Sequence, residues 1–116
     1  ADTVGRKRSK AIRTARKRID ASRKQLQAGE AVPAIGALRQ ALSGYVADTF
    51  NRPEAELTIE TMTHLLQTKG IAQDTIERFA KIIADCDFAR YAPQAQAATM
   101  AEELFAEAEK IINDLA

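Results

Sequence analysis

Aromatic residues are scarce in this sequence: Phe and Tyr together make up 5% of it, and Trp is absent. With so few rings, Ala, Leu and Ile must build the core, which favours closely packed helices over a sheet. Alternation of β-branched residues is also missing, as are the Asn-Gly and Asp-Gly pairs that mark tight hairpins. These absences predict an all-α fold.

The sequence has a single cysteine, Cys86, so it forms no intrachain disulfide and needs no oxidising compartment. It has no run of about eighteen apolar residues, so we expect the chain as given to span no membrane. It begins without Met and carries no signal-like apolar stretch. We therefore expect it to be a fragment or a processed product.

Helical periodicity predicts a single compact bundle of about five helices, the first of them long and basic. At 116 residues the chain has the size of one domain. Apolar residues at three- and four-residue steps place the helices at about 8–28, 33–50, 59–69, 75–88 and 95–115. The second has the strongest buried face, formed by Leu38, Ala41, Leu42, Tyr45 and Val46.

Local signals predict where the middle helices begin. Pro33 is expected at or near the first position of the second helix. Thr58 is expected to cap the third helix, with Leu57 packing against Met62.

Two further signals concern the end of the third helix and the start of the fourth. Gly70 is expected to close the third helix in a left-handed conformation, with Ile71 folding back on Leu66. Asp74 and Glu77 have the spacing of a capping box, so Asp74 is expected as the cap of the fourth helix.

Charge is distributed very unevenly along the chain, although its net value is only +1. Residues 1–29 hold ten basic residues against Asp2 and Asp20, while residues 30–116 hold seven basic and fourteen acidic residues. Such asymmetry points to an anionic partner for the basic end. The ten are Arg6, Lys7, Arg8, Lys10, Arg13, Arg16, Lys17, Arg18, Arg23 and Lys24.

The apolar seam of this basic segment is thin, and only three of its members are large. It consists of Ile12, Ala15, Ile19, Ser22 and Leu26. Residues 1–10 have no apolar face at all. We therefore expect the first helix to pack partially and its basic N-terminal half to project from the domain.

The sequence offers no set of residues suited to catalysis. His64 stands alone and is expected at the surface. Cys86 is expected to be a buried structural thiol, because Asp85 and Asp87 oppose a reactive thiolate. The last helix has a solvated acidic face of Glu102, Glu103, Glu107 and Glu109. Motifs for phosphate, nucleophile or zinc chemistry are missing, so we expect no enzyme, cofactor, metal or small-molecule substrate.

The basic segment has three interpretations. It can be a solvated helix face, a nucleic-acid-binding arm, or a segment that follows a transmembrane helix and contacts anionic lipid. The third explains most, because residues 1–29 lack both an aromatic for base stacking and a helix-turn-helix signature. A basic-armed helical nucleic-acid-binding module is the alternative. Lipid contacts are expected within residues 6–24, from Arg6, Lys7, Arg8, Lys10, Arg13 and Lys17.

Two of the six aromatic residues, Phe88 and Tyr91, lie within four residues of each other near the end of the fourth helix. In the favoured interpretation they fill the core, and Arg90 pairs with Asp48 or Asp87 to fix a corner between helices. In the alternative interpretation Phe88, Arg90 and Tyr91 bind a partner, because aromatics and Arg often anchor interfaces.

Four segments taken in order resemble the C-terminal region of the oxygen-tolerance (Bat, aerotolerance) protein BatD of bacteria. The similarity covers about residues 34–115, with a looser match in the basic lead, and the second helix here is richer in Ala and poorer in aromatics. The segments are ALRQALSGYVAD (37–48), RPEAELT (52–58), LLQTKGI (65–71) and CDFARYAP (86–93).

The resemblance implies a membrane-anchored protein with periplasmic β-sandwich domains, one transmembrane helix and this helical domain in the cytoplasm, at the bacterial inner membrane. Residues 1–29 would then be a basic juxtamembrane helix and residues 30–116 a helical interaction domain. The implied partners are a MoxR-type AAA+ ATPase and von Willebrand factor A-domain proteins, in oxygen or stress tolerance. The resemblance brings no catalytic residues with it.

Overall fold

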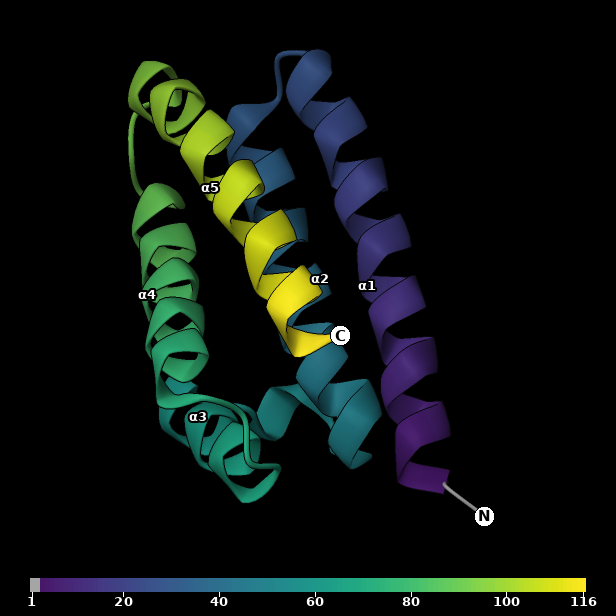
Figure 1. Ribbon diagram of the computed structural model, residues 1–116. Helices are drawn as coiled ribbons and strands as arrows, with labels where there is room; N and C mark the ends of the chain where they lie inside the picture. Colours follow the sequence, from purple (N-terminus) through teal and green to yellow (C-terminus); the bar gives the residue numbers. More distant parts are fainter. Residues whose placement is uncertain (1–2) are drawn as a thin grey trace.

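In the computed structural model, the backbone is described for residues 3–116 and the side chains for residues 9–116. Over residues 3–116 the chain forms five α-helices and one short 3-10 helix, without a strand (Figure 1). The prediction of an all-α bundle with a long basic N-terminal helix is confirmed. The elements are α1 (Thr3–Gln27), α2 (Ala31–Phe50), η1 (Glu54–Glu56), α3 (Ile59–Thr68), α4 (Gln73–Ala89) and α5 (Gln94–Leu115).

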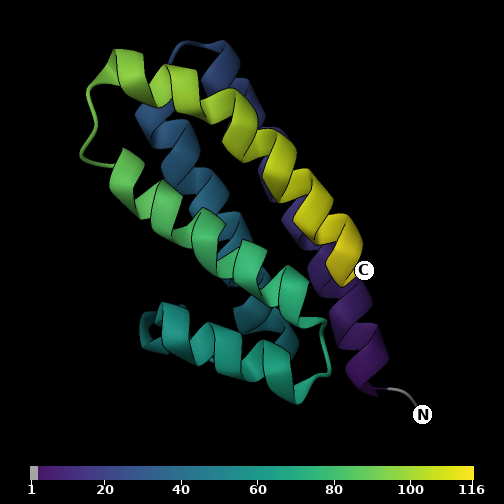
Figure 2. The ribbon, with the colours of Figure 1, turned by 60° about the vertical axis from the view of Figure 1, so that its left-hand side comes forward.

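Four long helices lie side by side and α3 crosses one end of them (Figures 1 and 2). The helices α2 and α5 pack against each other in the middle of the bundle, and each also contacts α1 and α4. Consequently α1 and α4 lie on opposite sides, with α2 and α5 between them. The short α3 packs against α2 and α4.

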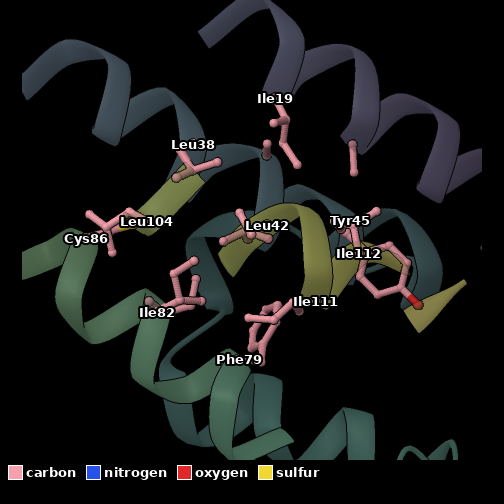
Figure 3. Close-up of a cluster of buried hydrophobic side chains, with 14 of the residues drawn as sticks. Ile19, Leu38, Leu42, Tyr45, Phe79, Ile82, Cys86, Leu104, Ile111 and Ile112 are labelled. Atoms are coloured by element: carbon pink, nitrogen blue, oxygen red, sulfur yellow. The ribbon is translucent and has the colours of Figure 1, made fainter. Parts of the chain in front are cut away.

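The central element is α2, as the sequence predicts. Every residue from 41 to 47 is buried, so the helix is enclosed on all sides over two turns. Figure 3 shows its side chains meeting those of α1, α4 and α5 in one core. The labelled members are Ile19, Leu38, Leu42, Tyr45, Phe79, Ile82, Cys86, Leu104, Ile111 and Ile112.

Alanine fills the space that a richer set of aromatics would otherwise take. Small side chains let helix axes approach closely, so many short contacts replace a few large ones. Alanines from four helices belong to the core: Ala11, Ala15, Ala31, Ala34, Ala41, Ala47, Ala89, Ala97, Ala101 and Ala108.

The predicted ends of α3 are confirmed. The Thr58 side chain accepts a hydrogen bond from the Thr61 N–H at 3.1 Å, which makes it the N-cap. Gly70 has φ 75°, and the Ile71 N–H donates to the Leu66 carbonyl at 3.2 Å. A second bond from Gly70 to Gln67 completes a Schellman motif.

The end of α1 has the same design. Gly29 has φ 85°, and its N–H donates to the Leu26 carbonyl at 3.0 Å. The Glu30 N–H donates to the Gln25 carbonyl at 3.0 Å. This turn sends the chain back along α1, so α2 runs antiparallel to it.

The start of α2 agrees with the prediction, whereas the predicted cap of α4 is wrong. The helix α2 begins at Ala31, so Pro33 is its third residue, near the first position; a first-turn N–H has no acceptor within the helix, and Pro is tolerated there. The cap of α4 is Ala72 rather than Asp74. Asp74 lies inside the first turn, where its charge suits the helix dipole, and its carboxylate is 3.9 Å from the Arg78 guanidinium.

The first helix packs more fully than its thin seam predicts. Ala11, Ile12, Ala15 and Ile19 are all buried, so the expectation that the basic half projects is wrong from Ala11 onward. The reason is that the alanines of α1 are small, so α1 and α2 approach each other closely and bury these side chains completely. Residues of α1 belong to the same core as those of the other helices. The division into a juxtamembrane helix, residues 1–29, and an interaction domain, residues 30–116, stays a prediction.

The left-handed conformation of Gly70 predicts that Gly70→Ala lowers the free energy of unfolding by about 1 kcal/mol, because a Cβ is strained at this φ. Gly36 is the matched control. It is exposed in the middle of α2, and a Cβ there would meet no atom within 4 Å. Gly36→Ala should stabilise by about 0.5–1 kcal/mol through helix propensity. Urea denaturation measures both, and shifts of the same sign would contradict the Gly70 cap.

Candidate interaction surfaces

The described basic side chains of α1 divide into a solvent-facing set and two flanks. A helix turns by about 100° per residue, so positions seven apart share a face. Lys10, Lys17 and Lys24 follow this spacing, and Arg13 lies beside them. All four are exposed, on the side of α1 opposite buried Ala15. We call Lys10, Arg13, Lys17 and Lys24 the outer basic face.

The flanking arginines bind neighbouring helices instead. On one side, the Arg18 guanidinium lies 3.7 Å from the Asp48 carboxylate of α2. On the other side, Arg23 binds Glu109 of α5 at 2.7 Å. Its guanidinium also lies 5.0 Å from the centre of the Phe105 ring, a cation–π distance.

A glycine makes room for one of these contacts. The Arg18 guanidinium lies directly over Gly44 of α2, where a Cβ would collide with it. A carboxylate oxygen of Glu54, in η1, comes close to the same point. Gly44 thus allows an arginine of α1 to lie across α2.

The outer basic face has no such partners. Within residues 9–116, none of its four side chains makes an ion pair or a side-chain hydrogen bond. Exposed Asp20 is the one acid of α1 on the described part of the chain. The charge of this face is therefore available to an outside group.

The structure brings three of the six predicted lipid contacts together: Lys10, Arg13 and Lys17. The side chains of Arg6, Lys7 and Arg8 lie outside the described residues. Lys24, at the end of the expected range 6–24, belongs to the same face; it is not among the six named contacts, although its seven-residue spacing from Lys17 is a usable signal. Contact of these residues with lipid stays a prediction.

A second surface lies at the end of α4. Phe88 is 61% exposed and Tyr91 83% exposed, so the favoured prediction that they fill the core is wrong. The helix continues through Ala89, which is fully buried and takes the inward position. Phe88 therefore points outward. We call Phe88, Arg90 and Tyr91 the aromatic corner.

Both acids proposed for Arg90 have other partners. Asp48 is close to Arg18, and Asp87 binds Arg39 of α2, with Nε 2.8 Å from Oδ1. Arg90 is exposed and forms no ion pair with any residue from 9 to 116. The predicted structural pair is thus wrong, and the partner-binding interpretation of this segment stays a prediction.

Cys86 is a core residue, as predicted. It is 3% exposed and faces α2 and α5 in Figure 3. Burial raises the pKa of its thiol to about 12, and the charges of Asp87 and Asp85 act in the same direction. The thiol therefore stays protonated at neutral pH and is a poor nucleophile.

A groove of about 330 Å³ between α4 and α5 is lined mainly by charged side chains. Arg78, one of the lining residues, donates to Glu107 at 2.8 Å and to Asp114 at 2.6 Å, and these bonds raise the pKa of the Arg78 guanidinium. Its charges thus bind the two helices to each other.

His64 is exposed on α3, as predicted.

Two further kinds of feature are absent over the residues described. His, Cys, Asp and Glu form no group of three or more that could hold a metal ion there. None of the helices in that part of the chain is both long and apolar enough to cross a membrane.

No protein-family model, curated protein or solved structure matches the chain. The resemblance to BatD is therefore a prediction that these comparisons do not support. The molecule itself has two candidate surfaces: the outer basic face, on α1, and the aromatic corner, at the end of α4. Figure 1 shows α1 and α4 on opposite sides of the bundle.

The contrast between two arginines yields a stability prediction. Arg90→Ala should change the free energy of unfolding by less than about 0.5 kcal/mol, since Arg90 is exposed and unpaired on the described chain. Arg39→Ala should cost about 1 kcal/mol, because it leaves the half-buried Asp87 carboxylate without its partner. Thermal and urea unfolding measure both. A loss at Arg90 as large as that at Arg39 would restore the structural interpretation of the corner.

Proposed function

We propose that this chain is a non-catalytic helical interaction domain that lies against an anionic membrane surface through the outer basic face. The observation that carries the proposal is the division of charge along α1. Arg18 and Arg23 bind neighbouring helices, while Lys10, Arg13, Lys17 and Lys24 face solvent without a partner on the described chain.

The geometry of α1 suits a flat partner. Its residues rise about 1.5 Å each, so the face from Lys10 to Lys24 spans about 20 Å of straight helix. All four cations can then lie within a Debye length of a planar surface, which is about 8 Å at physiological salt. A cation near anionic lipid contributes about 1 kcal/mol. Four give a few kcal/mol, less the repulsion of nearby Asp20.

A membrane fits this face better than nucleic acid does. Non-specific binding of single strands relies on aromatic side chains beside the cations, and the outer basic face has none. The exposed rings of Phe88 and Tyr91 lie at the end of α4, on the other side of the bundle. The acidic excess of residues 30–116 repels an anionic surface, so the domain should approach a membrane with its outer basic face and not with its other sides.

The resemblance to BatD extends this proposal to a cellular context. In that context the domain belongs to a membrane-anchored protein of the bacterial inner membrane and lies on its cytoplasmic side. Its partners are a MoxR-type AAA+ ATPase and von Willebrand factor A-domain proteins, in tolerance of oxygen or stress. The likeness of residues 34–115 to the C-terminal region of that family supports this step.

The test measures binding to phosphatidylcholine vesicles with and without phosphatidylglycerol. The triple variant Lys10→Gln, Arg13→Gln, Lys17→Gln should bind the anionic vesicles at least about tenfold more weakly, because it loses up to about 3 kcal/mol of surface attraction. The control removes the same charge away from α1, through Lys69→Gln, Arg90→Gln and Lys110→Gln. It should bind nearly as well as the wild type.

Two results would contradict the proposal. Equal losses in the two triple variants would mean that net charge, rather than the outer basic face, drives the binding. Tighter binding to duplex DNA than to anionic vesicles at the same salt concentration would favour the nucleic-acid-binding module instead.

A further inference from the structure

The aromatic corner is unusual in what it exposes. Among the described side chains, Phe88 and Tyr91 are the large hydrophobic ones that remain exposed, at 61% and 83%. Scattered single apolar residues need no explanation, but these two lie three residues apart where α4 ends. The aromatic corner therefore presents two exposed rings on the outside of the bundle, close together in the chain.

The acids around this surface are neutralised within the domain. Asp85, one turn before Phe88, accepts a hydrogen bond from Lys81 at 2.6 Å. Asp87, next to Phe88, is bound by Arg39 at 2.8 Å. Arg90 is left as the uncompensated charge of the corner, since it pairs with no residue in the part of the chain described. The surface is thus apolar with one free positive charge.

From this combination we infer that the aromatic corner docks a short segment of a partner protein that carries an apolar anchor and a neighbouring carboxylate. The rings supply contact area at low entropic cost, and Arg and aromatic residues are the side chains that most often dominate binding energy. The Arg90 guanidinium can bind a carboxylate through two parallel hydrogen bonds. The excess positive charge selects an acidic segment over a basic one.

A second copy of the chain fits the corner less well. A twofold contact would place the same surface on both sides and bring two free Arg90 side chains together. The acids that precede the corner in α4, Asp85 and Asp87, are already paired, so neither is a free carboxylate for the second copy's Arg90. The surface therefore suits a different chain.

The position of the corner leaves it accessible when α1 lies on a surface. The helices α2 and α5 separate α4 from α1 (Figures 1 and 2). A partner held at Phe88 and a surface held at Lys17 thus occupy opposite sides of one rigid bundle. The docking inference goes beyond the proposed function and does not depend on what α1 contacts.

A random-peptide display selection tests the inference directly, with the full 116-residue chain as bait. The wild type should enrich peptides in which Asp or Glu accompanies an aliphatic or aromatic residue. The charge reversal Arg90→Glu should enrich Lys or Arg in place of the acids. Because the peptides are random, the selection works while the natural partner is still unidentified.

The enriched peptide is then synthesised and its affinity measured. Phe88→Ala and Tyr91→Ala should each weaken its binding at least tenfold, while the exposed control His64→Ala on α3 should leave it unchanged. Because both rings are exposed, the variants should keep the wild-type thermal unfolding curve. If either unfolds, the charge reversal at Arg90 still decides the question.

Several results would overturn the inference. They are failure to recover any binding peptide, enrichment without an excess of acids, and enrichment that Arg90→Glu does not change. Sedimentation equilibrium adds one more: a dimer of the wild type that Phe88→Ala dissociates would assign the corner to a second copy.

Discussion

The fold depends on the enclosure of α2. With seven consecutive residues buried between 41 and 47, this helix contacts all the other long helices and α3 as well. A helix surrounded in this way must have small side chains on some sides, and Ala41, Ser43, Gly44 and Ala47 provide them. The scarcity of aromatic residues is thus part of the design, because larger side chains here would separate the helices.

Charged residues stabilise the outside of this core and leave two surfaces unsatisfied. Arginine bridges join each pair of neighbouring long helices except the central one: Arg18 to α2, Arg23 to α5, Arg39 to α4 and Arg78 to α5. On the described chain, the outer basic face of α1 forms no ion pair, and the aromatic corner at the end of α4 leaves Phe88 and Tyr91 exposed and Arg90 unpaired. Because α1 and α4 lie on opposite sides, the membrane contact and the docked segment proposed above would not compete for the same surface.

Sequence patterns predicted most of what depends on local geometry, with the cap of α4 as the exception, and missed what depends on distant residues. The third helix was predicted correctly because Thr58 and Gly70 act on backbone groups within a few positions. The orientation of Phe88 was not, because it depends on Ala89 taking the buried position at the end of α4. The isolation of Arg90 was equally hidden, since its two expected partners pair with arginines that are distant in the sequence. The prediction for α1 was wrong for a further reason: hydrophobic patterns give small residues such as alanine little weight, so they underestimate how closely this helix packs.

The most direct test of this two-sided arrangement measures which helix lies nearer to a membrane. Exposed Ala21 on α1 and exposed Ala84 on α4 can each be changed to Cys and labelled with a fluorophore, while buried Cys86 stays unreactive. Energy transfer to an acceptor lipid in anionic vesicles then reports the distance of each helix from the surface. The account predicts strong transfer from the α1 label and weak transfer from the α4 label. Equal transfer, or stronger transfer from α4, would contradict it.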